Sequence, residues 1–243
     1  MSVLKIEDLS VRIADKKVLN GVNLEVPKRE THILLGPNGS GKTSLIMSIL
    51  GSPSCQVLSG RIRFDGTDIT NLPTDERARL GLGVAFQNPP AIRGVKLGDV
   101  FRHIAKGEVS EVELTRITNI PMEFLERDLN LGFSGGELKR SEIFQVLAQR
   151  PSFAIFDEPD SGVDVENLEI IGKAISEFLK GRSGLLITHL GHILRYVDTD
   201  VAHVLVGGKI ACSGEPSRIF NLIMKRGYRW CEKCPRAKKP CLR

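Results

Sequence analysis

The feature that most constrains this chain is a glycine-rich segment that directly follows a short apolar run. The run Thr31–Leu35 leads into residues Gly36–Thr43, which read G-P-N-G-S-G-K-T and match the pattern G-x-x-x-x-G-K-[ST]. A helix-compatible run, Ser44–Leu50, comes next. This order of strand, loop and helix predicts a loop whose backbone N–H groups surround phosphate groups at a helix N-terminus. The chain is therefore expected to adopt an α/β fold around a parallel sheet.

Within this loop, each residue type suits a nucleotide triphosphate with its magnesium ion. Lys42 is expected to neutralise the β and γ phosphates, and Thr43 to place its hydroxyl on Mg²⁺. ATP and Mg²⁺ are thus the predicted ligands. The predicted nucleotide-binding residues of the loop are Gly36, Asn38, Gly39, Ser40, Gly41, Lys42, Thr43 and Ser44.

Two adjacent carboxylates end a second apolar run. Phe153–Phe156 is followed by Asp157 and Glu158, and ligands of open α/β sheets bind at the carboxyl ends of the strands. Adjacent strand residues point to opposite faces, so the two carboxylates can differ in role. We expect Asp157 to hold the Mg²⁺ shell and Glu158 to polarise the attacking water as a general base.

Hydrophobic patterning predicts the remaining architecture. Short apolar runs typical of buried parallel strands occur at 31–35, 153–156, 185–187 and 201–206. Strand patterns at 3–13, 22–26 and 61–66 predict an antiparallel sheet, with a turn at 15–17. Apolar spacing over 168–178 predicts a helix that ends near Gly181, and Gly207–Gly208 predicts a hairpin turn. The polar, helix-compatible segment 88–132 predicts an inserted helical lobe.

A third motif gives these pieces a family resemblance. Phe133–Glu137 reads F-S-G-G-E, and its place between the glutamine Gln87 and the Asp157–Glu158 pair, with Thr188–His189 following, resembles the motif order of ABC ATPases over about residues 1–222. The resemblance implies a RecA-like parallel core, an antiparallel β subdomain and a small helical subdomain. It also implies that Gln87 senses Mg²⁺ and the attacking water, and that His189 contacts the γ phosphate. Glu158, His189 and Gln87 are the implied catalytic residues, with Mg²⁺ held through Thr43, Gln87 and Asp157.

The resemblance further implies that two copies of the chain share each nucleotide. In ABC ATPases the signature segment of one protomer closes over the phosphates held by the other, so ATP-dependent self-dimerisation is expected. The residues implied in this contact are Ser134, Gly135, Gly136, Glu137 and, in the loop Ser161–Asp164, Asp164. Most ABC ATPases stack an aromatic side chain on adenine, and the corresponding stretch Val11–Ala14 has none.

Four spaced stretches resemble the SufC family of ABC ATPases more closely than the transporter subunits. They are Asn130–Arg140, Asp157–Asp164, Thr188–Tyr196 and Gly227–Trp230. The resemblance implies an ATPase that drives a SufB-like scaffold, or a SufB/SufD pair, during iron–sulfur cluster assembly. A segment from Gln87 to Ser134 shorter than is usual in the family favours a single SufB-like partner. Two alternatives stay open: the nucleotide-binding subunit of a membrane ABC transporter, and a metal carrier whose ATP site is regulatory.

Charge and cysteine placement set the end of the chain apart. The formal net charge is +5, but the last 19 residues hold eight Lys or Arg and one acidic residue, so the body is nearly neutral. A nucleic-acid partner is therefore not expected. The chain has no apolar stretch of membrane-spanning length and no secretory leader pattern, which predicts a cytoplasmic protein without direct membrane insertion.

The expected domains are an ATPase domain over 1–228, with its helical subdomain at about 88–133, and a basic tail over 229–243. Cys231, Cys234 and Cys241 in this tail have spacing suited to a thiolate-bound metal. Three interpretations remain: a site for an iron–sulfur cluster or iron, a structural zinc site, and a tail without metal. Cys55 and Cys212 are isolated among apolar or small residues and are expected to be structural.

Overall fold

The computed structural model describes residues 2–107 and 109–232. Its centre is a six-stranded sheet with the strand order β12-β11-β3-β10-β9-β6. Five strands are parallel, and the hairpin partner β12 runs antiparallel to β11. The bounds are β3 Thr31–Leu35, β6 Leu82–Ala85, β9 Phe153–Asp157, β10 Ser183–Thr188, β11 Val201–Val206 and β12 Lys209–Gly214. The sheet matches the predicted parallel core, and the turn between β11 and β12 falls at Gly207–Gly208 as predicted.

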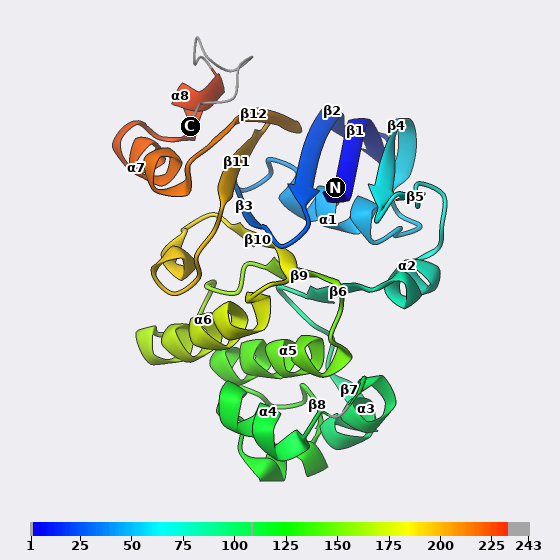
Figure 1. The fold of residues 1–243 in the computed structure, drawn as a ribbon, viewed down its shortest axis with the longest axis vertical. Coiled ribbons are helices and arrows are strands. Elements are labelled where there is room, and N and C mark those ends of the chain that lie inside the picture. The colour runs from blue at the N-terminus through cyan, green and yellow to red at the C-terminus, as the bar shows by residue number, and fades with distance from the viewer. Residues whose placement is uncertain (1, 108, 233–243) are drawn as a thin grey trace.

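A second, four-stranded antiparallel sheet lies beside the first (Figure 1). Its order is β2-β1-β4-β5, with β1 Ser2–Ile13, β2 Lys16–Pro27, β4 Gln56–Phe64 and β5 Thr67–Asp68. The predicted turn at 15–17 was wrong, because Lys16 and Lys17 already pair with β1. The turn consists of Ala14 and Asp15, and Ala14 takes the left-handed conformation that the tight reversal requires, with a φ of 48°.

Helices cover the other side of the parallel sheet and extend away from it (Figure 1). The segment predicted as a helical lobe contains α3 Leu97–Ile104, α4 Glu111–Thr118 and the short 3-10 helix η1 Met122–Glu126. It also contains a small antiparallel ladder of β7 Ile92–Lys96 and β8 Asp128–Leu129, which the sequence did not indicate. The remaining helices are α1 Lys42–Ile49, α2 Thr74–Leu80, α5 Gly135–Gln149, α6 Val165–Leu179, the 3-10 helix η2 His192–Arg195, α7 Pro216–Arg226 and α8 Tyr228–Glu232.

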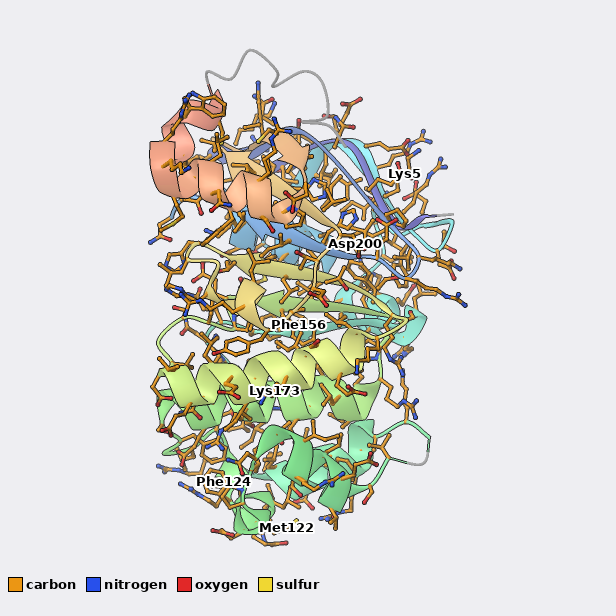
Figure 2. The ribbon with its side chains drawn as sticks, turned by 60° about the vertical axis from the view of Figure 1, so that its left-hand side comes forward. Lys5, Met122, Phe124, Phe156, Lys173 and Asp200 are labelled. Carbon is orange, nitrogen blue, oxygen red and sulfur yellow. The ribbon has the colours of Figure 1, made fainter. Side chains whose placement is uncertain are left out.

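The parallel sheet separates two hydrophobic cores because successive strand residues face opposite sides. In β3, Leu34 packs with the antiparallel sheet and α1, whereas Ile33 and Leu35 pack on the helical side. Phe156 lies in this sheet layer, and Phe124 lies near the far end of the helical region, opposite Lys5 (Figure 2). The sheet thus holds the ends of β3, β9 and β10 rigidly between two packed layers. None of the helices in the described residues is long and apolar enough to cross a membrane.

Candidate nucleotide site

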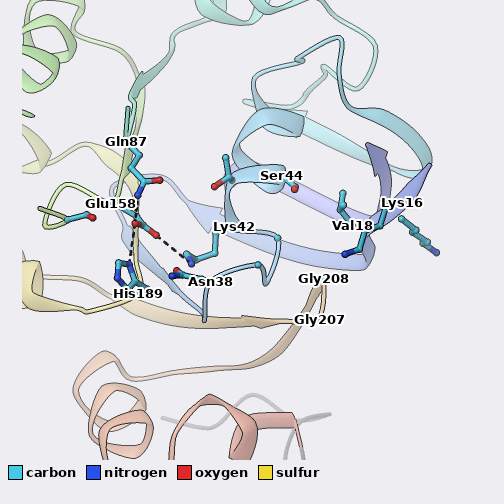
Figure 3. A pocket seen from close by; sticks show the side chains of 15 residues that line it. Lys16, Val18, Asn38, Lys42, Ser44, Gln87, Glu158, His189, Gly207 and Gly208 are labelled. Atoms are coloured by element: carbon cyan, nitrogen blue, oxygen red, sulfur yellow. Dashed lines mark hydrogen bonds and ion pairs between the residues drawn. The ribbon is translucent and has the colours of Figure 1, made fainter. Parts of the chain in front are cut away.

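A cavity of about 830 Å³ opens at the carboxyl ends of the parallel strands (Figure 3). Most of the predicted phosphate loop lines it, together with residues of β2, of the loops that follow β6, β9 and β10, and of the turn after β11. Its lining residues are Lys16, Lys17, Val18, Asn38, Gly39, Gly41, Lys42, Thr43, Ser44, Gln87, Glu158, Ser161, His189, Gly207 and Gly208. The predicted loop and the three implied catalytic residues therefore meet in one space.

The phosphate loop is folded tightly around its own lysine. The Lys42 ammonium group donates hydrogen bonds to the carbonyl oxygens of Gly36, at 2.9 Å, and Pro37, at 3.2 Å. Burial lowers the pKa of Lys42, and the nearby Glu158 carboxylate opposes that shift. Gly41 needs to be glycine, because its φ is 107° and a Cβ there would stand 3.2 Å from the carbonyl oxygen of Val18.

The hairpin turn after β11 supports this loop, a role that the sequence did not reveal. The Gly208 N–H donates to the Ser40 carbonyl at 2.9 Å, and the Gly208 carbonyl accepts from the Asn20 N–H at 2.9 Å. A Cβ at Gly208 would lie 2.3 Å from the Val18 carbonyl oxygen. Only glycine allows the turn to approach β2 so closely, and this approach completes the wall of the cavity.

Glu158 is the centre of the candidate catalytic group (Figure 3). Its carboxylate accepts a hydrogen bond from the Gln87 amide at 2.7 Å and lies 3.6 Å from the Lys42 ammonium group. His189 Nδ1 lies 3.2 Å from the same carboxylate, at ion-pair distance but without hydrogen-bond alignment. Glu158 has a φ of 47°, which is uncommon for a residue with a side chain. Its backbone N–H donates to the Ile187 carbonyl at 2.8 Å, which holds this conformation in place.

Asp157 precedes the lining residue Glu158, does not itself line the cavity and is only 5 % exposed. Burial, and then the neighbouring Glu158 charge, raise the pKa of Asp157 to about 6, although Lys139 and Lys42 oppose the shift. A buried carboxylate with a raised pKa lacks sufficient positive charge around it, and a divalent cation would supply that charge. Thr43 and Gln87, the other predicted Mg²⁺ ligands, line the cavity. The residues present therefore fit a magnesium ion.

Two buried side chains from α5 hold the segment that carries Gln87. The Lys139 ammonium group donates to the Gln87 carbonyl at 2.9 Å, and the Glu142 carboxylate accepts from the Phe86 N–H at 3.1 Å. Burial lowers the pKa of Lys139 and raises the pKa of Glu142. Sequence analysis assigned no role to these two side chains, because their partners lie more than 50 positions away.

A second network holds the segment that carries His189. The Asp160 carboxylate accepts hydrogen bonds from the Thr188 hydroxyl at 2.8 Å and from the His192 N–H at 3.0 Å. The Tyr228 hydroxyl of α8 donates to the His189 carbonyl at 2.9 Å. The backbone around His189 is thus held by Asp160 and Tyr228, to which sequence analysis assigned no role.

The signature segment does not line the cavity. Ser134 caps α5: its hydroxyl accepts from the Glu137 N–H at 3.4 Å, while the Glu137 carboxylate accepts from the Ser134 N–H at 2.7 Å. Ser134 and Gly135 are exposed, and a Cβ on Gly136 would lie 2.6 Å from the Asn167 side chain. Asp164 is exposed and caps α6 by accepting from the Asn167 N–H at 2.8 Å. Their contact with nucleotide stays a prediction.

The stretch Val11–Ala14, which the resemblance places near adenine, does not line the cavity, so its contact with the base stays a prediction. Val11 lies in β1, between β2 and β4, and is fully buried. Lys16, Lys17 and Val18 line the cavity instead, because the chain reverses at Ala14 and returns along β2. That wall also has no aromatic side chain.

The predicted cysteine site is only partly within the described residues. Cys231 lies in α8 and is fully buried, whereas Cys234 and Cys241 lie outside the described residues. Within 2–107 and 109–232, no three His, Cys, Asp or Glu side chains come close enough to hold a metal ion. Metal binding at these cysteines therefore stays a prediction.

Comparison with known proteins places this geometry in a family. The family model described as "ABC transporter" matches residues 19–161. The chain is 40% identical to Vegetative protein 296 of Bacillus subtilis, over 94% of this chain and 93% of the relative. It is 38% identical to the probable ATP-dependent transporter ycf16 of Cyanidium caldarium, over 94% of this chain and 96% of that relative. The solved nucleotide-free ATP-binding cassette of an ABC transporter superposes with a TM-score of 0.78 at 25% identity, covering 95% of this chain and 98% of that one. The chain therefore belongs to the ABC transporter family, as an ATP-binding ATPase subunit.

Proposed function

We propose that this chain hydrolyses Mg²⁺-bound ATP in a dimer and uses the cycle to change the conformation of a SufB-like scaffold for iron–sulfur cluster assembly. The phosphate loop would hold the triphosphate, and Thr43, Gln87 and Asp157 would hold the magnesium ion. The ion would neutralise charge on the phosphates. Glu158 would take a proton from the attacking water, and His189 would contact the γ phosphate.

The placement of the signature segment supports a shared site. Ser134 and Gly135 are exposed at the N-terminus of α5 and do not line their own chain's cavity. A helix N-terminus binds anions, so this end of α5 suits the phosphates held by a second copy. A two-fold dimer would then contain two nucleotide sites, each built from both chains.

Two inactive variants can test this arrangement together. Lys42→Ala removes the phosphate contact of one chain, and Ser134→Arg blocks the signature of the other. Each variant alone is expected to lack turnover. A 1:1 mixture forms mixed dimers in which one of the two sites is intact, so roughly a quarter of wild-type turnover should return if the sites act independently. A mixture as inactive as its components, while both variants keep native circular dichroism, would contradict the shared site.

The observation that carries the cluster-assembly proposal concerns residues of the SufC-like stretches. Three residues of these stretches form hydrogen bonds with a segment that carries Gln87 or His189. They are Lys139, Asp160 and Tyr228. These three contacts therefore join the SufC-like residues to the residues expected to sense the γ phosphate. A partner bound near α5 or α8 could influence hydrolysis through them. The segment between Gln87 and Ser134 is shorter than is usual in the family, which favours one SufB-like partner.

The alternative is the nucleotide-binding subunit of a membrane transporter, which the names of several relatives favour. Anaerobic purification from the native host, with identification of partners and analysis of iron and sulfide, separates the two functions. A soluble SufB-like partner with iron and acid-labile sulfide is expected. An integral membrane permease as the partner, without iron, would overturn cluster assembly and leave ATP hydrolysis intact.

A further inference from the structure

Two charged side chains of α5 hold the start of the loop between β6 and β7. The Lys139 ammonium group donates to the Gln87 carbonyl at 2.9 Å. The Glu142 carboxylate accepts from the N–H of Phe86, the first residue after β6, at 3.1 Å. Lys139 and Glu142 are at positions i and i+3 of the helix, so they lie on the same face. That face of α5 therefore fixes the backbone on either side of the Phe86–Gln87 peptide.

A third contact holds the end of the same loop through Asn130. The Asn130 side-chain amide donates to the Pro90 carbonyl at 3.1 Å. The Asn130 side-chain carbonyl accepts from the Ser141 hydroxyl of α5 at 3.0 Å, and both residues are buried. Helix α5 thus holds both ends of the segment 86–90, and a shift of the helix would move the whole segment, including Gln87.

The burial of two charges at this contact indicates a purpose beyond stability. Lys139 and Glu142 are each only 7 % exposed. Buried opposite charges often stabilise a fold no more than well-packed apolar side chains would, and they can instead specify one geometry. The geometry specified here is that of the loop, because both charges are bonded to its backbone. The Gln145 amide also donates to the Glu142 carboxylate, at 3.2 Å, and orients it.

Helix α5 connects this loop to the signature segment. The helix begins at Gly135, is capped by Ser134, and packs against β6, α3, α4 and α6 (Figure 1). At a rise of about 1.5 Å per residue, the cap lies roughly 12 Å along the helix axis from Glu142. Close-packed interiors transmit displacements instead of absorbing them. A displacement of the exposed helix N-terminus is therefore expected to reach the backbone of Gln87.

We propose that Glu142 and Lys139 are positioning residues that couple the two nucleotide sites of the dimer. Nucleotide held by one copy contacts the N-terminus of α5 in the other copy, and α5 then sets the place of Gln87 in that copy's own site. This inference rests on the shared site proposed above. The Gln87 amide donates to the Glu158 carboxylate at 2.7 Å, so a shift of its backbone changes the hydrogen bonding of the expected general base.

Steady-state kinetics of the full chain test the positioning role. Glu142→Ala removes the acceptor of the Phe86 N–H, so kcat should fall by roughly 2–30-fold, the usual range for coupling residues, while KM for ATP stays near wild type. Glu142→Gln keeps an acceptor oxygen and should recover most of kcat. Glu177→Ala, the same replacement on an exposed side chain of α6, is the matched control and should behave as wild type. Unchanged kinetics of Glu142→Ala, or a higher KM with unchanged kcat, would overturn the positioning role.

Hydrogen exchange in a mixed dimer tests the coupling itself. The receiving chain carries Lys42→Ala, so its own site lacks the phosphate contact while its signature segment is intact. The second chain carries Ser134→Arg and holds ATP. Both chains also carry Glu158→Gln to prevent hydrolysis, and isotopic labelling of one chain distinguishes their peptides. ATP should slow the amide exchange of residues 86–91 in the receiving chain only when the second chain is present.

The same measurement with Glu142→Ala in the receiving chain should show no slowing, although light scattering detects an unchanged amount of mixed dimer. A mixed dimer whose residues 86–91 exchange equally with and without ATP would overturn the coupling and leave the shared site intact. Absence of the mixed dimer would overturn both. Lys139→Met breaks the neighbouring contact and provides a second variant if Glu142→Ala does not fold. If neither variant folds, the receiving chain without these substitutions decides the matter.

Discussion

Replacement of Asp157 by asparagine should stabilise the nucleotide-free protein while it damages the magnesium site. Asp157 is buried, and its pKa of about 6 in the folded chain lies well above the ordinary 3.8. The folded state therefore binds its proton more tightly than the unfolded state does. The stabilisation of the folded state by this bound proton is fully present below about pH 4 and is lost as the pH rises through 6.

The difference between the two pKa values sets the size of the effect. Each pKa unit corresponds to about 1.4 kcal/mol, so the ionised carboxylate lowers the free energy of unfolding by up to about 3 kcal/mol above pH 7. Asparagine has nearly the same shape and stays neutral. The Asp157→Asn chain should thus gain up to about 3 kcal/mol relative to wild type between pH 4 and pH 7.5, or roughly 6–12 °C in Tm. The opposing attraction to Lys42 and Lys139 is already contained in that pKa.

Urea denaturation at a series of pH values, without nucleotide or metal, measures this difference. Asp198→Asn serves as the matched control, because it makes the same replacement on an exposed side chain. Addition of Mg²⁺ and ATP should reverse the ranking, since only the carboxylate attracts the cation. The electrostatic reasoning would be refuted if the free energies of unfolding of Asp157→Asn and wild type differed by the same amount at every pH from 4 to 7.5.

Other expected outcomes concern catalysis and packing. Glu158→Gln should retain ATP binding in an equilibrium titration but lose about 10²–10⁴-fold in single-turnover hydrolysis, the usual loss for a general base; unchanged hydrolysis would exclude this role. Tyr228→Phe removes one hydrogen bond to the His189 carbonyl, so Tm should fall by roughly 2–4 °C with a several-fold decrease in turnover. A lower Tm with unchanged turnover would show that this contact of α8 does not influence catalysis. Arg77→Met should cost at least about 3 kcal/mol in urea unfolding, because the buried guanidinium donates to four backbone carbonyls, two at the end of α1 and two in the segment before α2; a smaller loss would show that water replaces it.

The predicted elements that the structure confirms are those specified by neighbouring residues in the sequence. The run Thr31–Leu35 and the glycines after it specify strand β3 and the tight loop without reference to any distant residue, and Gly207–Gly208 specifies its hairpin in the same way. The short strand β6 was missed because Leu82–Ala85 has only four residues and contains a glycine. That glycine is needed because a Cβ there would lie 2.6 Å from the Pro151 ring, a contact that only the folded chain creates.

What the sequence determined by itself is the position of the phosphate loop after β3, of the carboxylate pair at the end of β9 and of the signature motif at the start of α5, because each depends on residue types at short, fixed spacing. Only the tertiary structure decided how those parts are held. The support of Gln87 by Lys139 and of His189 by Tyr228 joins residues 52 and 39 positions apart. The contact of Glu142 with the Phe86 N–H likewise depends on the packing of α5 against β6. Such contacts follow from the packing of layers on a sheet, and a linear pattern carries no record of which distant side chains that packing brings together.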